Sequence, residues 1–232
     1  GTVCWYRRIS PVWLRCGLRQ AAPTGYGTGM DVLLAAVLGY LLGSIPFGLL
    51  LTRAAGLGDV RKQGSGNIGA TNVLRTGSKK LAAATLLLDL AKGLAPVLIA
   101  RALFDQPDAM PQAAYGPVPV AALAAVIGHC FPVWLGFKGG KGVATNAGVC
   151  FGLAWPLGLT YAIVWLAILG GLRISSLAGM AAVVCAAIAA SILDCEPFVP
   201  VLALIAVLVL WLHRANIGRL VKGEEPKVGA KK

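Results

Sequence analysis

Acidic residues are scarce in this sequence, and charged residues of either sign are few. Of 232 residues 13% are charged, with only nine Asp or Glu against 21 Lys or Arg, for a net charge of +12. Hydrophobic residues make up 57%, and the mean hydropathy is +0.76. Long apolar runs with so little charge exclude an ordinary soluble domain. The sequence therefore predicts an all-α, polytopic integral membrane protein.

Motifs for metal, disulfide and covalent chemistry are lacking as well. The six cysteines show no CxxC and no metal-like spacing, so we expect neither a zinc site nor a disulfide framework. No GxSxG elbow for a serine nucleophile occurs. Nucleic acid is not expected as a partner, because the basic residues lie in short segments between apolar runs with few aromatic residues among them.

The apolar runs predict seven membrane crossings. They cover about residues 31–51, 81–104, 118–135, 143–172, 177–193 and 198–212. Trp155-Pro156 interrupts the run 143–172, which we therefore divide into two short helices. Pro46 removes one helical hydrogen bond and predicts a kink in the first crossing, where we expect Ser44 to cap the freed backbone.

The charges between these runs predict the orientation. Loops 105–117 and 194–197 contain no Lys or Arg and are placed on one face. The basic segments are 53–80, 136–146, 173–176 and 213–232. Because positively charged segments stay in the cytoplasm, these four are predicted to be cytoplasmic.

Residues 1–29 differ from the rest of the chain. They carry four arginines, yet seven crossings with the basic segments in the cytoplasm would place them outside. We expect 1–29 to be an N-terminal extension that is not part of the functional domain and is dispensable. The transmembrane domain is then 30–222, and 223–232 is a basic cytoplasmic tail.

The stretch 64–77, GSGNIGATNVLRTG, is a polar, glycine-rich loop between apolar runs. Glycines free its backbone to direct N–H groups at an anion, and Arg75 offers a planar fork for phosphate oxygens. Gly64, Gly66 and Gly69 match GxGxxG, but no strand or βαβ unit surrounds them, which argues against a dinucleotide fold. The alternative is a flexible hydrophilic loop.

A second such stretch, GFKGGKGVATN at 136–146, places Lys138 and Lys141 among four glycines. It is not a Walker A loop, because Gly142 stands where that motif needs Ser or Thr. Two lysines beside a flexible backbone favour an anion site. The alternative is that they anchor the chain at the membrane interface, which explains the charges and not the glycines.

Other polar residues recur at helical spacing. Asp89 and Lys92, three apart inside an apolar run, share a helix face and predict a structural ion pair, with ligand binding as the alternative. His213, Asn216 and Arg219 recur every three residues past the last crossing and predict contact with a polar substrate at the membrane edge, or else a solvated helix. His129 lies in an apolar run and predicts a buried, hydrogen-bonded histidine.

Six motifs together resemble the bacterial acyl-phosphate:glycerol-3-phosphate acyltransferase family, PlsY, over about residues 30–225. They are GSIP at 43–46, GSGNIGATNVLR at 64–75, DLAKG at 89–93, GH..P at 128–132, GFKGGKGVAT at 136–145 and H..NI.RL at 213–220. The resemblance implies a seven-helix enzyme of the inner membrane with a cytoplasm-facing site. Such an enzyme moves an acyl group from acyl phosphate to the 1-hydroxyl of sn-glycerol-3-phosphate, giving lysophosphatidic acid and phosphate in phospholipid biosynthesis.

The resemblance also implies roles for individual residues. By matched position, the catalytic residues are Ser65, His213 and Asn216. The substrate-binding residues are Gly66, Asn67, Gly69, Thr71, Asn72, Arg75, Lys138, Gly139, Gly140, Lys141, Ser175 and Ser176. The partners implied are the two substrates, the lipid bilayer and a soluble enzyme that makes acyl phosphate. No cofactor or metal is expected.

The residues agree with this chemistry. Acyl phosphate is a mixed anhydride that already carries a leaving group, so positioning and charge stabilisation matter more than a covalent nucleophile. The HxxxxD motif of other glycerolipid acyltransferases is missing, because Trp134 and Gly218 follow the two histidines at that spacing. A transporter for phosphate-bearing solutes and a structural protein are the competing classes. The first predicts a site at the membrane midplane, whereas the polar clusters here lie at one edge.

Overall fold

The computed structural model describes residues 29–104 and 115–229, and every regular element in this part of the chain is helical, which confirms the all-α prediction. The α-helices are α1 (Gly29–Gly43), α2 (Phe47–Ala54), α3 (Ala70–Leu74), α4 (Lys79–Phe104), α5 (Pro117–Cys130), α6 (Val143–Leu153), α7 (Trp155–Leu172), α8 (Ser175–Ile192), α9 (Val199–Leu212) and α10 (Arg214–Val221). Short 3-10 turns cover Val60–Lys62, Val133–Leu135 and Glu196–Phe198. The expectations for residues 1–28 and most of the loop 105–117 lie outside the described residues.

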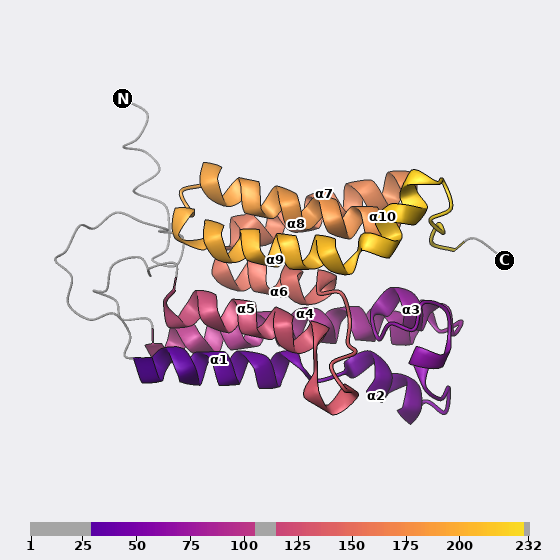
Figure 1. The fold of residues 1–232 in the computed structure, drawn as a ribbon, viewed down its shortest axis with the longest axis horizontal. Coiled ribbons are helices and arrows are strands. Elements are labelled where there is room, and N and C mark those ends of the chain that lie inside the picture. The colour runs from indigo at the N-terminus through magenta and orange to yellow at the C-terminus, as the bar shows by residue number, and fades with distance from the viewer. Residues whose placement is uncertain (1–28, 105–114, 230–232) are drawn as a thin grey trace.

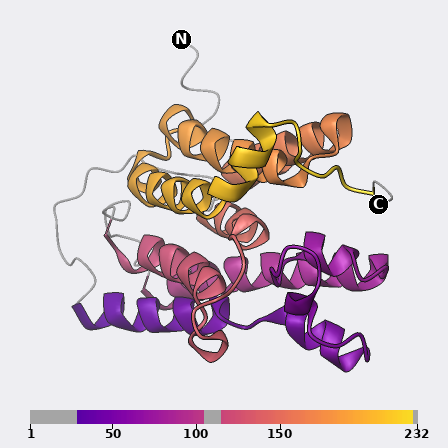
Figure 2. The ribbon, with the colours of Figure 1, turned by 45° about the vertical axis from the view of Figure 1, so that its right-hand side comes forward.

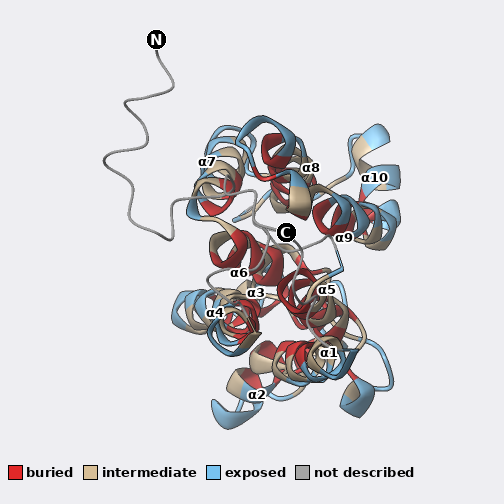
Figure 3. Ribbon diagram, turned by 90° about the vertical axis from the view of Figure 1, so that its left-hand side faces the viewer, coloured by how far each residue is buried: buried red, intermediate tan, exposed pale blue. Residues whose placement is uncertain are grey.

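The helices form two groups joined by α6. Helices α1, α4 and α5 pack on one another, α7 packs on α8 and α8 on α9, and α6 contacts both α4 and α7 (Figure 2). Burial is greatest in the middle of the bundle, in α5 and α6 (Figure 3). The α7 span is only 17% buried, against 61% for the α5 span. Because the exposed residues of α7 include Ile163 and Leu166, this helix presents an apolar face to lipid.

The length and composition of the helices agree with a multi-pass membrane protein. Five helical segments of the described chain are long and apolar enough to span a membrane, and the bent pair Glu196–Leu212 and Arg214–Val221 makes a sixth if it is counted as one span. Helix α6 has 11 residues, about half of the roughly 20 needed to cross. The multi-pass prediction is confirmed, and the count of seven crossings stays a prediction.

The first crossing is interrupted at GSIP, where a kink was expected, since α1 ends at Gly43 and α2 begins at Phe47. Ser44 Oγ donates to Leu41 O, 2.9 Å away, so the serine satisfies one carbonyl of the preceding turn. Two other carbonyls at the break accept hydrogen bonds from residues far away in the sequence: Ser44 O accepts from Trp134 Nε1 at 2.8 Å, and Ile45 O from Lys92 Nζ at 2.7 Å. Tertiary contacts therefore hold this break.

The predicted division of 143–172 is also confirmed. Helix α6 ends at Leu153, Ala154 is extended, and α7 begins at Trp155. Pro156 occupies the first turn of α7, where its missing N–H leaves no helical bond unmade.

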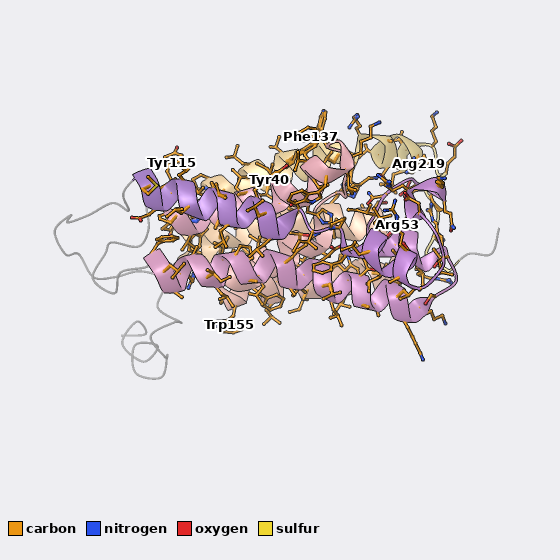
Figure 4. All side chains as sticks on the ribbon, turned by 90° about the horizontal axis from the view of Figure 1, so that it is seen from below. Tyr40, Arg53, Tyr115, Phe137, Trp155 and Arg219 are labelled. Carbon is orange, nitrogen blue, oxygen red and sulfur yellow. The ribbon has the colours of Figure 1, made fainter. Side chains whose placement is uncertain are left out.

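The polar loops gather at one end of the bundle. Helices α2, α3 and α10 all lie at that end (Figure 1). Arg53 and Arg219 are found there, and Tyr115 lies at the opposite end (Figure 4). This arrangement places the two glycine-rich stretches near the last helix, although the sequence separates them widely.

Candidate active site

The first glycine-rich loop is organised around Asn72, which is only 2% exposed. Its Nδ2 donates to the carbonyls of Val60, Gln63 and Asn67 at 2.9, 3.1 and 2.7 Å. Its Oδ1 accepts from the Ser65 N–H at 3.0 Å. Because the amide is fully occupied by the loop, Asn72 shapes the site rather than offering free donors to a ligand.

Backbone conformation explains two of the glycines in this loop. Gly64 and Gly66 have φ of +54° and +71°, in the left-handed region that favours glycine. The Arg75 side chain lies against Gly64, because a Cβ placed there would meet Arg75 Cδ and Nη1. Arg75 is exposed, and its guanidinium lies alongside the loop at Gly64.

The second glycine-rich loop is bonded to the end of α5. The Gly139 N–H donates to Cys130 O at 3.0 Å, and the Gly140 N–H donates to His129 O at 2.9 Å. A methyl group on Gly140 would overlap the imidazole of His129. These contacts fix the residue before Lys141, whose side chain reaches Asn216 Oδ1. Lys138, in contrast, is exposed.

A buried charge pair lies beneath this loop. Lys92 Nζ is 2.8 Å from Asp89 Oδ1, and both side chains are 2% exposed, which confirms the predicted ion pair. His129 is buried as expected, with Nδ1 3.8 Å from the same carboxylate oxygen. That distance exceeds a hydrogen bond, and Nδ1 has no hydrogen-bond partner in the described chain. The expectation of a hydrogen-bonded ring is therefore wrong for Nδ1.

His213 lies at the bend of 61° between α9 and α10. Its Nδ1 is 2.7 Å from Val209 O. A carbonyl oxygen only accepts, so Nδ1 carries a proton and Nε2 of the neutral ring is an acceptor. This tautomer suits an imidazole that receives a hydrogen bond from a substrate hydroxyl.

Glu225 joins the residues that follow the last crossing. Its carboxylate accepts hydrogen bonds from Ser176 Oγ (2.6 Å), Asn216 Nδ2 (2.6 Å) and Arg219 Nε (2.7 Å). Burial raises the pKa of this carboxyl, but the three donors outweigh burial and leave the pKa below its usual range. Glu225 was not predicted from the sequence, because it lies in a tail that was interpreted as basic. The local signal for it was the pair of adjacent acidic residues, Glu224 and Glu225.

One cavity of about 130 Å³ unites most of these groups. Its lining includes nine of the predicted site residues: Ser65, Asn67, Gly69, Thr71, Asn72, Lys141, Ser175, Ser176 and His213. The predicted residues off its lining are Gly66, Arg75, Lys138, Gly139, Gly140 and Asn216. Asp89 and His129 also line it, which the sequence reading had not assigned to the site.

A second, more apolar cavity of about 170 Å³ adjoins the first. Both are lined by Ala70, Thr71, Leu86, Trp165 and Ser175. We call the first one the polar cavity because its lining includes Asp89, Lys141 and His213. A cavity with such side chains that shares a wall with a more apolar one fits a ligand with an anionic head and an alkyl chain.

A family model described as glycerol-3-phosphate acyltransferase matches residues 33–223. This chain belongs to that family. Curated glycerol-3-phosphate acyltransferases are similar over most of their length: the Erythrobacter litoralis protein is 63% identical over 202 residues, covering 87% of this chain and 98% of that protein. The Mesorhizobium japonicum protein is 58% identical, covering 86% and 97%.

Solved structures agree with this family membership. A crystal structure of PlsY, an integral membrane glycerol 3-phosphate acyltransferase in its glycerol 3-phosphate form, superposes with a TM-score of 0.77 at 38% identity, covering 86% of this chain and 96% of that one. The lysophosphatidic acid form gives 0.75 at 36% identity, covering 85% and 95%. The resemblance read from the motifs is confirmed.

The electrostatics around Lys141 suit an acyltransferase that handles phosphate. Burial lowers the pKa of its ammonium group, and the charges of Arg219, Arg214 and Arg75 lower it further against the opposing effect of Glu225. These cations repel one another, and a phosphate dianion that binds among them offsets the repulsion.

We predict that the KM for glycerol-3-phosphate rises at alkaline pH. The rise should begin at a pH below 10.5, the pKa of an ordinary lysine, because the pKa of Lys141 is lowered. Only the protonated ammonium binds phosphate strongly, and a lowered pKa means that its charge is lost at a lower pH. The ligand stays dianionic there, since its second pKa is about 6. Initial rates between pH 7 and 10 test this, with Lys141→Arg as the control because a guanidinium stays charged. A flat wild-type profile would contradict the assignment.

Proposed function

We propose that this protein transfers an acyl group from acyl phosphate to the 1-hydroxyl of sn-glycerol-3-phosphate, forming lysophosphatidic acid and phosphate. The observation that carries the proposal is the single cavity that brings together both glycine-rich loops, His213 and Ser176 beside an apolar chamber. The names of the relatives, and the two ligand forms of the PlsY structure, support the same reaction. The site faces the cytoplasm of a bacterial inner membrane, and a soluble enzyme supplies acyl phosphate.

Different residues neutralise the phosphate charge and position the attacking hydroxyl. Lys141 and Arg75 neutralise phosphate, while Asn72 holds the loop that carries Ser65. Ser65 and His213 line the same cavity, and His213 Nε2 accepts a hydrogen bond that orients the attacking hydroxyl. As the oxygen attacks the acyl carbon of the mixed anhydride, the hydroxyl proton passes to His213 Nε2, the bond between the acyl carbon and the phosphate oxygen breaks, and phosphate leaves. Because the donor is already activated, positioning and charge stabilisation are enough to drive transfer.

The direct test is turnover by the purified protein. Acyl phosphate and labelled glycerol-3-phosphate should give labelled lysophosphatidic acid, whereas acyl-CoA should not replace acyl phosphate. Two results would overturn the proposal: turnover with acyl-CoA at a comparable rate, or a stable acyl adduct trapped on the protein.

Arg75→Lys is expected to lower kcat/KM by roughly ten- to a hundredfold, mainly through the KM for glycerol-3-phosphate. Lysine keeps the charge but cannot bind two phosphate oxygens in parallel, so the variant separates phosphate binding from a role as a membrane anchor. Ser65→Ala should weaken the same site. Both variants should insert in the membrane at normal levels. Full activity of Arg75→Lys with an unchanged KM would return Arg75 to the anchoring role.

A further inference from the structure

The C-terminal tail is hydrogen-bonded to the turn between α7 and α8 through Arg173 and Val228, a contact that we call the clip. Val228 N–H donates to Arg173 O at 2.6 Å. In return Arg173 Nη2 and Nε donate to Val228 O at 2.8 and 3.2 Å. Arg173 itself has a φ of +59°, which places its backbone and its guanidinium so that both reach the same tail residue. Three hydrogen bonds thus fix one point of the tail.

The clipped residue forms a wall of the apolar cavity. Val228 lines the cavity of about 170 Å³ together with Leu74, Leu169 and Trp165. Among the described tail residues it alone does so. Three positions earlier, Glu225 bonds Ser176, which lines the polar cavity. The segment 225–228 therefore contacts one cavity wall through Glu225 and forms part of the other through Val228.

Neither half of this clip belongs to the motifs that identify the family. Arg173 and Val228 lie outside all six motifs, and Val228 lies beyond residue 223, where the family match ends. The contact also joins residues 55 apart in the sequence, so only the fold brings them together.

We propose that Val228 determines acyl-chain binding and that Arg173 is a positioning residue that holds it in place. This inference rests on the proposed function. With the tail clipped, Val228 forms one wall of the apolar cavity and shields the part of the acyl chain next to the reacting carbonyl from water. Without the clip, that side of the cavity opens, and the same methylene groups lose their apolar cover.

Two truncations form a matched pair. A chain that ends at Lys227 loses Val228, whereas a chain that ends at Gly229 keeps the clip and loses only residues 230–232. We expect the shorter chain to show about a tenfold higher KM for long-chain acyl phosphate, the scale for exposing a few methylene groups. For a short-chain donor the rise should be at most twofold, and the KM for glycerol-3-phosphate should change little. The longer chain should match the full protein.

Point variants distinguish the contribution of the Val228 side chain to the cavity wall from that of the Arg173 hydrogen bonds that hold it. Val228→Ala keeps the backbone bonds and should raise the long-chain KM about threefold. Arg173→Ala should approach the effect of the shorter truncation, and Arg173→Lys, which keeps charge without the fork, should fall between. Equal KM values for the two truncations at every chain length would overturn the proposal. So would a parallel rise in the KM for glycerol-3-phosphate, because the tail would then act through Glu225 and the polar cavity.

Binding of dodecyl phosphate, a non-reacting alkyl phosphate, tests the tail without turnover. Its affinity for the chain ending at Lys227 should fall by about the same factor as the KM rises, and equal affinity for the two truncations would count against Val228. A full-length protein that binds dodecyl phosphate but makes no lysophosphatidic acid would refute the proposed function alone. The two failures are therefore distinguishable.

Discussion

Lys92→Met is expected to lower the free energy of unfolding by about 3–5 kcal/mol. The substitution removes the partner of Asp89, whose carboxylate is 2% exposed and lies within an apolar helix. It also removes the donor to Ile45 O at the break between α1 and α2. A buried charge without a partner keeps the cost of leaving water and loses the attraction that offsets it. Thermal and denaturant unfolding in a mild detergent would measure the loss.

The double variant Asp89→Leu/Lys92→Met is the matched control. Replacing a buried ion pair by apolar residues of similar size is often neutral or stabilising, so the second substitution should recover most of the lost stability. Recovery would show that the cost of Lys92→Met comes from the unpaired carboxylate. If Lys92→Met alone left the protein as stable as the wild type, the pair would have no structural role.

Gly140→Ala is expected to lower kcat/KM by about a hundredfold or more. The added methyl group would overlap the His129 ring, which is 3% exposed and cannot move aside. The loop must therefore shift, and it carries Lys141 with it. A displacement of about 1 Å in a group that positions substrate is enough to cost about a hundredfold in rate. Steady-state kinetics with both substrates would measure the effect.

Gly171→Ala provides the control for a glycine-to-alanine change. Gly171 lies in α7, where a methyl group would meet nothing within 4 Å. Alanine favours a helix over glycine by about 1 kcal/mol, so activity and expression should match the wild type. Near-normal activity of Gly140→Ala would mean that the second loop tolerates movement and that Lys141 is not fixed by His129.

Local patterns predicted the parts of this protein that depend on local physics. Apolar run length located the membrane helices, because a helix must satisfy its backbone groups internally in lipid. Pro46 and Pro156 marked the two helix breaks, since proline lacks the N–H that an uninterrupted helix requires. Spacing of three placed Asp89 beside Lys92 and Asn216 beside Arg219.

Local patterns did not predict contacts between residues that are far apart in the sequence. Glu225 bonds Ser176 across 49 positions, and Lys141 reaches Asn216 across 75. The predicted binding role of Asn72 illustrates the same limit, because its amide is used to fold the loop. Residue type alone does not distinguish a side chain that binds substrate from one that holds a neighbour.

The sequence by itself determined the membrane character, the helical class, the family and the position of the two glycine-rich loops, because each depends on composition or on residues close together in the chain. Only the tertiary structure decided that Asp89, His129 and Glu225 join the site and that the polar cavity adjoins an apolar one. The physical reason is that the packing of α4 on α5 and of α8 on α9, the helix that leads into α10, sets these distances. That packing depends on the shapes of many side chains at once, which no single motif records.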